Sequence, residues 1–485
     1  MIPQYIFVSA KRSKGILMSY QQDNQQKDQQ KSKRIMIAAW GSRGDLQPVT
    51  ALALGLKKTG REVLVFATPP ATDLFQKNGI DCIVAKENIA DVVERMFCQA
   101  DLSDRSFSGL IKLAKFGKNF FNDPEYIAIQ KQDMLSALKA AQEFKPDLLI
   151  IPNLFYGPYG SIGELLQIPV VTLDMQINHP TSEYPLFTME VGKLPKFFNS
   201  YFYKLKGWLY PKTMKPKFDM MREICGLPIE QYSDGSRFKV WPHDLPQLCA
   251  VSPSLCPQPT DWPQQKLMSG WCFLESGDEY TPPAELVEFL KHKPVYIGFG
   301  SMKGNPEFCQ SLSTLAIKGL QLAGVKGVLL GGWAGLTRDS LDVSTDEGKE
   351  LYAWSQENIL EIDSCPHDWL FPQCAAVVHH GGAGTLAAGI RAGRPTLVCA
   401  TQGDQPFYGS LVQARGIGKY LGLVGSDKLT AETIAAGIKQ VTSDQSIITA
   451  AQAMAEQVKT EDGVENAIRF IDKMAASFNY PWPIK

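Results

Sequence analysis

Two glycine-containing segments, more than 300 positions apart, carry residues whose types and spacing suit the binding of a polar ligand. The first reads Gly-Ser-Arg-Gly-Asp-Leu-Gln-Pro from Gly41 to Pro48, directly after a short apolar run. Its two glycines permit a tight turn from a strand into a helix. Asp45 can cap that helix while it faces a ligand, and a helix cap without any ligand is the alternative interpretation.

The second segment runs from Ala375 to Gly409 and begins with a buried-strand pattern that ends in two histidines. The glycines after them let the backbone approach a ligand closely, and Thr385 opens an Ala-rich helix. Unpaired N–H groups, the positive end of the helix dipole and a histidine donor together suit a diphosphate. A histidine pair in a loop without a ligand is the alternative. The residues concerned are His380, Gly381, Gly382, Gly384 and Thr385.

Two shorter segments add polar groups to this set. Asp404 and Gln405 follow the next apolar run and offer a carboxylate beside an amide, a pair that recognises adjacent sugar hydroxyls, although a helix start alone would also explain them. Ser301 follows Gly298-Phe299-Gly300 and could turn its hydroxyl toward phosphate. The spacing there is not Gly-x-Gly-x-x-Gly, which argues against an NAD-dependent oxidoreductase.

Composition excludes other classes of ligand. No Asp-x-Asp, no His-Glu-x-x-His and no clustered Cys/His ligands occur, so we expect neither a metal nor a cofactor. A net charge of -1 gives no electrostatic reason for nucleic-acid binding. The ten cysteines show no Cys-x-x-Cys pair, which favours reduced thiols and a cytoplasmic location.

The elements that must position these residues alternate between strands and helices. Strands are expected at 35–40, 62–68, 146–153 and 169–175, with helices at 47–59, 71–78 and 161–166, which indicates a parallel sheet covered by helices. A proline-rich stretch at 241–283 is expected to lack regular structure over much of its length and to end in a linker. Strands then restart at 295–299, 326–330, 375–379 and 395–400. Two doubly wound α/β domains are predicted to face each other across a substrate cleft.

The first 34 residues contain seven Lys/Arg and two Asp, and we interpret them as a polar leader outside the fold. Such a charge could favour an anionic membrane surface, so contact at the membrane periphery is a second interpretation of this segment. No apolar run reaches the length of a spanning helix.

These motifs resemble the family 1 nucleotide-sugar glycosyltransferases of GT-B fold, and among them most closely the sterol 3-beta-glucosyltransferases. The similarity rests on GSRGDLQPVTALALGL and HHGGAGTLAAGIRAGRPTLVCATQGDQPFYG, with supporting matches at 252–255, 259–263 and 366–372, and it covers most of 34–475. The resemblance implies a disordered leader at 1–33, an acceptor-binding domain at 34–277 and a UDP-sugar-binding domain at 278–485. The resemblance leaves open whether the last helix crosses back to the first domain.

The resemblance also implies a role for each site residue. Asp45 is then the general base. The donor is held by a set drawn from both domains, with Cys365 and His367 facing the uracil and Asp404 and Gln405 on the sugar: Ser42, Arg43, Gly44, Ser301, Cys365, His367, His380, Gly382, Gly384, Thr385, Asp404 and Gln405.

The implied reaction is an inverting transfer of glucose from the co-substrate UDP-glucose to the hydroxyl of a sterol or similar apolar acceptor. The sequence departs from the sterol enzymes at 175–180, where Met-Gln-Ile-Asn-His-Pro replaces a Pro-Trp-Thr run, and the lipid-binding modules of fungal relatives are absent. Another lipid or natural-product acceptor therefore stays open as an alternative, as does a non-catalytic lipid- or sugar-binding protein.

Overall fold

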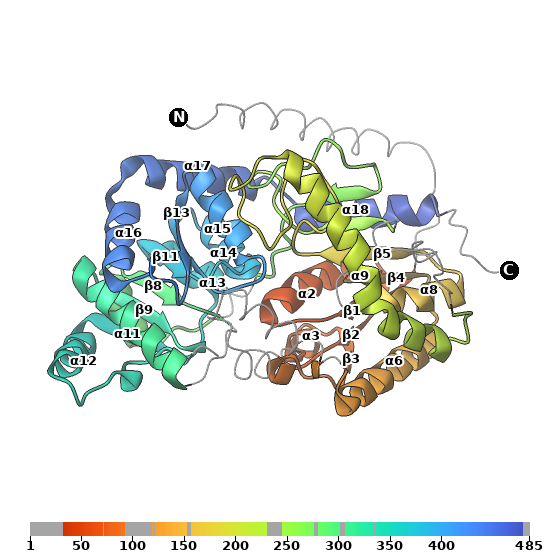
Figure 1. The fold of residues 1–485 in the computed structure, drawn as a ribbon, viewed down its shortest axis with the longest axis horizontal. Helices are drawn as coiled ribbons and strands as arrows, with labels where there is room; N and C mark the ends of the chain where they lie inside the picture. The colour runs from red at the N-terminus through yellow and green to blue at the C-terminus, as the bar shows by residue number, and fades with distance from the viewer. Residues whose placement is uncertain are drawn as a thin grey trace.

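The computed structural model describes residues 33–70, 72–92, 119–120, 122–152, 157–229, 245–275, 280–300, 306–332 and 335–478, without the side chains of 209–213. These residues form two parallel sheets, each covered by helices, that lie side by side (Figure 1). The expected pair of doubly wound α/β domains is confirmed. Within the described helices, none is both long and apolar enough to cross a bilayer.

The first sheet has seven parallel strands in the order β3-β2-β1-β4-β5-β6-β7. Successive side chains of β1 alternate between two cores: Ile35 and Ile37 pack on one face and Met36 and Ala38 on the other, as a sheet covered on both faces requires. Its strands are β1 (Arg34–Ala39), β2 (Glu62–Ala67), β3 (Asp81–Val84), β4 (Leu148–Ile151), β5 (Val170–Asp174), β6 (Gln247–Cys249) and β7 (Lys266–Met268). Its helices are α2 (Arg43–Lys58), α3 (Asp73–Lys77), α6 (Pro124–Phe144), α8 (Gly160–Leu166) and α9 (Phe197–Ile224).

The second sheet has six parallel strands in the order β10-β9-β8-β11-β12-β13. They are β8 (Val295–Gly298), β9 (Gly327–Leu330), β10 (Ile359–Ile362), β11 (Ala376–His379), β12 (Thr396–Ala400) and β13 (Gly418–Leu423). Around them lie α10 (Ala284–Leu290), α11 (Pro306–Ala323), α12 (Asp346–Asn358), α13 (His367–Leu370), α14 (Ala383–Arg391), α15 (Gln405–Ala414), α16 (Ala431–Ser443) and α17 (Gln445–Lys459), whereas the last helix, α18 (Gly463–Ala476), packs on the first domain.

Two details differ from the sequence-based expectation. The helix expected from residue 47 begins at Arg43, because Ser42 is its N-cap and forms a capping box with Asp45. The expected cap by Asp45 is therefore wrong in position: Asp45 is the third residue of the helix and bonds back to Ser42. The proline-rich stretch at 241–283 contributes β6 and β7 to the first sheet, where β6 pairs with β5 and β7 pairs with β6.

The two halves of the chain share buried side chains. One apolar cluster joins Val251 and Leu255 of the first half to Phe407 and Tyr408 of the second. Helix α18 packs on α2 and adds Phe470 and other side chains to the core of the first sheet, so the end of the chain stabilises its beginning. In Figure 1 this helix, in deep blue, lies among the elements of the first domain.

Candidate active site

Both signature segments lie at a point where the strand order of a sheet reverses. In the first sheet this point falls between β1 and β4, and in the second it falls between β8 and β11. Open α/β sheets bind ligands in the crevice outside the carboxyl ends of the strands at such a point. The loops that follow β1 and β11 are those that carry Asp45 and His380.

The Asp45 carboxylate is held at the first turn of α2. Its Oδ2 atom accepts hydrogen bonds from the Ser42 backbone N–H at 2.8 Å and from the Ser42 hydroxyl at 3.2 Å. Burial raises the pKa of Asp45 to about 6, although the bonds from Ser42 act in the opposite direction. A carboxylate with a pKa closer to neutrality is a stronger proton acceptor than an ordinary aspartate.

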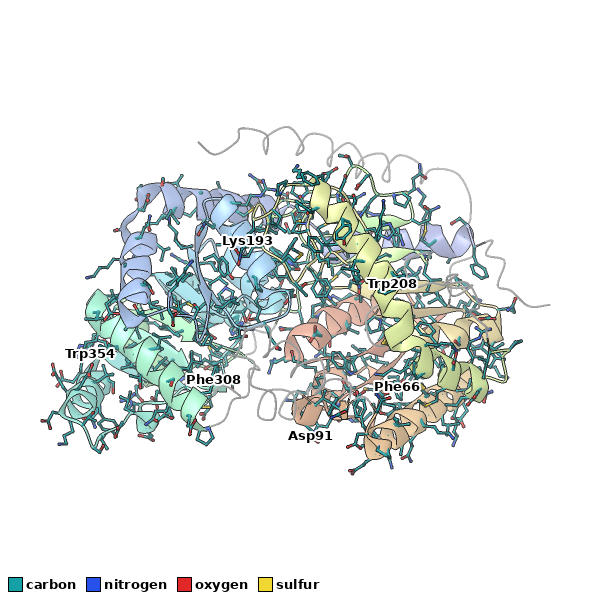
Figure 2. The ribbon with its side chains drawn as sticks, viewed as in Figure 1. Phe66, Asp91, Lys193, Trp208, Phe308 and Trp354 are labelled. Carbon is teal, nitrogen blue, oxygen red and sulfur yellow. The ribbon has the colours of Figure 1, made fainter. Side chains whose placement is uncertain are left out.

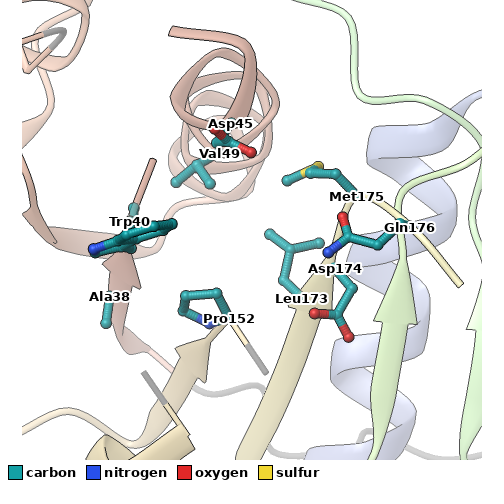
Figure 3. A pocket seen from close by; sticks show the side chains of 10 residues that line it. Ala38, Trp40, Asp45, Val49, Pro152, Leu173, Asp174, Met175 and Gln176 are labelled. Atoms are coloured by element: carbon teal, nitrogen blue, oxygen red, sulfur yellow. The ribbon is translucent and has the colours of Figure 1, made fainter. Parts of the chain in front are cut away.

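A pocket opens beside Asp45 at the carboxyl ends of β1, β4 and β5. Trp40 and Met175 lie on opposite sides of it with Pro152 between them, and Asp45 and Val49 border it from α2 (Figure 3). The cavity has a volume of about 90 Å³, which is smaller than the range of about 300–1,000 Å³ for small-molecule sites, and it widens into space that is open to solvent. Its lining is mostly apolar, with Asp45, Asp174 and Gln176 as polar exceptions.

The loop after β11 closes around the His380 ring. A Cβ at Gly300 would lie 2.7 Å from Cε1 of His380, and a Cβ at Gly382 would lie 2.3 Å from its Nε2, so both positions need glycine. Burial lowers the pKa of His380 to about 4, which makes the ring neutral at pH 7. Its Nδ1 atom is buried without a hydrogen-bond partner.

Helix α14 begins beside this ring and has no side-chain cap. Gly382 is its N-cap residue, and Gly384 and Thr385 lie in its first turn. Its first N–H groups and the positive end of its dipole are therefore available to an anion next to His380. The helix starts at Ala383, two residues before the Thr385 start expected from the sequence.

Asp404 and Gln405 follow β12 at the start of α15. Burial, and then the neighbouring charge of Asp45, raise the pKa of Asp404 to about 7. The Gln405 side-chain oxygen accepts hydrogen bonds from the backbone N–H and hydroxyl of Thr401, both at 2.7 Å. That oxygen is therefore engaged within the loop, and a contact of Gln405 with a sugar would use the amide nitrogen.

The two signature segments meet across the domains. A Cβ at Gly384 would lie 3.4 Å from Cα of Gly44, so the first turn of α2 and the first turn of α14 are in close contact. The electrostatic influence of Asp45 on Asp404 is a second link between the halves. The predicted base and the predicted diphosphate site thus face one crevice.

Of the remaining predicted residues, His367 lies within electrostatic reach of Arg43 and His380. His367 stacks on Phe371, with ring centroids 4.3 Å apart, and burial followed by the charge of Arg43 lowers its pKa to about 4. Arg43 itself is exposed. Cys365 precedes α13, and burial raises its pKa to about 11. Ser301 lies outside the described residues.

The geometry of the described residues also bears on metal binding and on disulfide formation. Across the parts of the chain that the structure describes, no three His, Cys, Asp or Glu side chains group closely enough to hold a metal ion. The nine cysteines within those parts are unbridged. Metal independence itself stays a prediction.

Comparison with known proteins identifies the family. A sterol 3-beta-glucosyltransferase of Arabidopsis thaliana is 30% identical over 486 aligned residues, which cover 96% of this chain and 70% of the relative. The chain belongs to the sterol 3-beta-glucosyltransferase family. A family member from Yarrowia lipolytica is 31% identical over 89% of this chain, but the match spans only 28% of that longer protein.

Solved structures and a family model agree with this membership. The glycosyltransferase of kitacinnamycin superposes with a TM-score of 0.60 at 17% identity and covers 91% of this chain and 99% of its own. The glycosyltransferase VinC in complex with dTDP gives 0.58 at 16% identity, with 91% and 99% covered. At these identities the likeness shows the fold, which is that of GT-B glycosyltransferases. Residues 343–468 also match the model of the erythromycin biosynthesis protein CIII-like C-terminal domain.

Several pocket residues of this family member were missed by the sequence reasoning. Trp40 and Asp174 stand at the carboxyl ends of β1 and β5, and Pro152 directly follows β4. The signal that could have found them is position, because the residues that end parallel strands beside the switch point line the crevice. Asp174 accepts a hydrogen bond from Gln247, a residue of the stretch that had been expected to lack strands.

Proposed function

We propose that this glycosyltransferase-family chain transfers glucose from UDP-glucose to the hydroxyl of a sterol or a similar apolar acceptor, with inversion at the anomeric carbon. The observation that carries the proposal is the meeting of the two signature segments, which brings a carboxylate with a raised pKa and an uncapped helix N-terminus to one crevice. Both relatives are sterol 3-beta-glucosyltransferases by name, which supports the sugar and the acceptor class.

In the proposed reaction Asp45 is the general base. Both bonds from Ser42 go to Oδ2, so we assign the acceptor's proton to Oδ1. As the proton leaves, the acceptor oxygen bonds to the anomeric carbon from one face while the bond to the β-phosphate oxygen breaks on the other. UDP leaves with the electron pair of that bond, and the product is a β-glucoside.

The second domain stabilises the charge that develops on UDP. Since the His380 ring is neutral at pH 7, it contributes as a hydrogen-bond donor rather than as a cation. The first N–H groups of α14 supply the remaining donors without a change of protonation. Asp404 is proposed to bind a sugar hydroxyl, with Gln405 beside it through its amide nitrogen, and Cys365 and His367 are proposed to face the uracil.

The apolar pocket next to Asp45 supports an apolar acceptor. Trp40, Val49, Pro152, Leu173 and Met175 offer hydrocarbon and aromatic surface within reach of the proposed base. A ring system laid against these side chains would bring one hydroxyl to Asp45, so a single sugar would be added at a defined position.

The direct test is incubation with UDP-glucose and a panel of sterols, macrolides, carotenoids and flavonoids, scored by UDP release and by the anomeric configuration of the product. Sterol-dependent UDP release with a β-linked glucoside supports the proposal. Activity only on a different acceptor class would change the acceptor assignment, and UDP-glucose binding without transfer to any acceptor would indicate a binding protein.

Two further parts of the proposal concern cofactors and location. Because the diphosphate has His380 and a helix N-terminus for compensation, transfer should continue in EDTA, and a complete loss that Mg²⁺ reverses would contradict this. Residence in the cytoplasm, with contact at membranes, is proposed because the nine described cysteines form no disulfide and because the proposed acceptor is apolar.

A further inference from the structure

Helix α9 exposes a stripe of large apolar side chains along one face. Phe197, Tyr201, Leu205 and Trp208 follow one another at spacings of four, four and three residues, which places them on one side of a helix. Their exposed fractions are 72%, 60%, 38% and 58%. A soluble surface helix normally buries such residues, so this concentration of exposed aromatic side chains marks an interaction surface.

The opposite face of α9 is fastened to the protein. Asn199 donates to the carbonyl of Ser182 at 3.0 Å and Tyr203 donates to the carbonyl of Pro185 at 3.2 Å, and both side chains are buried. These bonds hold the helix in a fixed orientation. The exposure of the stripe therefore follows from that orientation and not from loose packing. Figure 2 shows α9 with Trp208 on the outside of the N-terminal half.

The surroundings of the stripe carry positive charge. Residues 191–218 contain seven lysines and neither Asp nor Glu, although Lys206 and Lys217 are half-buried and Lys215 is paired with Asp219. Lys196 and Lys204 are exposed beside the stripe, whereas Lys193 is paired with Glu190 at 3.0 Å. Exposed aromatics flanked by lysines, on a helix of 28 residues, are the pattern of a helix that lies in the interface of an anionic bilayer.

We infer that the exposed stripe of α9 docks the protein onto anionic membrane surfaces, with the aromatic rings in the headgroup region and the lysines on the lipid phosphates. Lipid is favoured over a protein partner because Lys196 and Lys204 are exposed beside the stripe with no acidic residue between them in the sequence, and because Tyr and Trp are enriched at the membrane–water interface.

Docking in this orientation would bring the pocket close to the lipid. The Lys206 ammonium, on the buried side of α9, contacts Asn178, three residues after Met175 in the pocket wall. The segment just before α9 is tied to the second domain, since the Val191 N–H donates to the Ser410 hydroxyl at 2.7 Å. The reason for docking, delivery of an apolar acceptor from the bilayer, rests on the proposed function, whereas docking itself does not.

The test is sedimentation of the full chain with vesicles, which requires no sugar transfer. We expect binding to phosphatidylcholine vesicles that contain about 30% phosphatidylserine, weaker binding to pure phosphatidylcholine, and weakening by salt. The triple variant Phe197→Ser, Tyr201→Ser and Trp208→Ser should lose affinity about tenfold or more, and Lys196→Glu with Lys204→Glu should lose the preference for phosphatidylserine.

A matched control removes exposed apolar groups elsewhere. Val287, Leu322 and Val343 of the second domain are exposed by 42%, 40% and 50%, and their triple Ser variant should bind vesicles like the unchanged chain. Thermal unfolding shows that each variant is folded, and UDP-glucose turnover with a detergent-dispersed acceptor reports the proposed function separately. An unchanged chain that does not sediment, or an α9 variant that binds equally well, would overturn the inference. So would a dimer in solution that the α9 variant alone dissolves, because the stripe would then be an interface between two copies.

Discussion

The Asp45 carboxylate combines a structural bond with the proposed proton transfer, and a single substitution separates them. In Asp45→Asn the amide oxygen can still accept the Ser42 N–H, so the capping box is kept and the free energy of unfolding should change by less than about 1 kcal/mol. The proton acceptor is lost, so turnover should fall by roughly 10² to 10⁴-fold. UDP-release kinetics and calorimetry with UDP measure the two effects. Near-normal sterol glucosylation by a folded Asp45→Asn protein would contradict the general-base assignment.

The same residue predicts a pH dependence of activity. Asp45 must be deprotonated to act as base, and burial raises its pKa to about 6. We therefore expect kcat/KM to rise through about pH 6 and to level off above it, rather than near the pKa of an ordinary aspartate. The residual rate of Asp45→Asn should lack this step. A rate that is flat from pH 5 to 8, or a step that persists in the variant, would assign the titration to another group.

Asp404 predicts a pH dependence of stability. Its pKa rises from 3.8 to about 7 on folding, so the fold prefers the protonated carboxyl. The stability that it contributes is fully present below about pH 4 and is lost as the pH rises through about 7. Asp404→Asn should remove this loss, so the variant should be more stable than the unchanged chain by about 1–2 kcal/mol at pH 8, a value discounted for partial exposure, and equal to it near pH 4.

Denaturant unfolding of both proteins across that pH range measures the difference. Its growth with pH distinguishes a titrating carboxyl from a simple packing effect, which would be the same at every pH. Use of UDP-glucose should fall in the same variant, because a stabilising change at a binding residue removes a group that the ligand needs. Calorimetry should then show weaker binding of UDP-glucose and nearly unchanged binding of UDP.

At the scale of single residues, the sequence predicts which residues belong to the candidate site better than it predicts the contacts between them. The sequence identifies Asp45 and His380 as candidate site residues because each follows a predicted strand and lies in a glycine-containing segment. The influence of Asp45 on Asp404 joins two halves of the chain, and no local pattern records it. The engagement of the Gln405 oxygen with Thr401 likewise depends on the shape of a loop.

At the scale of elements, the glycines around the β11–α14 loop shape the proposed diphosphate site. Gly382 has an extended backbone, with φ of -61° and ψ of 140°, that alanine also adopts, so Gly382→Ala adds only a methyl group where Nε2 of His380 lies. The ring must move, and we expect the affinity for UDP to fall about tenfold with the fold intact. Calorimetry measures this loss. Gly207→Ala in α9, where nothing lies within 4 Å, is the matched control and should bind UDP normally.

A double variant makes this prediction sharper. If Gly382→Ala acts through the His380 ring, it should cost little further affinity in a His380→Ala background, because the ring that it displaces is already gone. Additive losses would show that the methyl group disturbs the helix N-terminus itself.

Among the elements that the sequence did not predict, the strands β6 and β7 take their order from neighbouring strands. β6 and β7 have three residues each, too few to show a period of two, and they become strands by pairing beyond β5. Helix α9 was not predicted either, because its exposed aromatics obscure the usual apolar stripe on one face. Helices with a clear buried face and strands of buried β-branched residues can be predicted from the local sequence alone.

At the scale of the whole molecule, helix α18 ties the end of the chain to the first domain. Glu461, just before it, accepts hydrogen bonds from the Ser252 hydroxyl at 2.8 Å and the Ser254 N–H at 3.0 Å. Asp472 pairs with Arg61, whose side chain is only 2% exposed. Since α18 also fills part of the core of the first sheet, we expect residues 34–277 alone to be less stable than the same residues with α18 in place.

Gly55 is where α18 approaches α2 most closely. A Cβ at Gly55 would lie 2.3 Å from Cγ1 of Val464, so Gly55→Ala should push α18 away and cost about 1–3 kcal/mol of unfolding free energy. Val464→Ala should cost about 1 kcal/mol by itself, since Val464 is only partly buried.

Combining the two substitutions tests whether the contact between position 55 and Val464 causes the loss of stability. In a Val464→Ala background the obstructing methyl group is absent, while alanine in the interior of α2 gains about 0.5–1 kcal/mol over glycine. Gly55→Ala should therefore change sign, from destabilising alone to neutral or stabilising in the double variant, in denaturant unfolding. A loss that is equal in both backgrounds would mean that the strain lies elsewhere along α2. Because α2 carries Asp45 at its first turn, recovery of turnover together with stability would show that the end of the chain helps to position the proposed base.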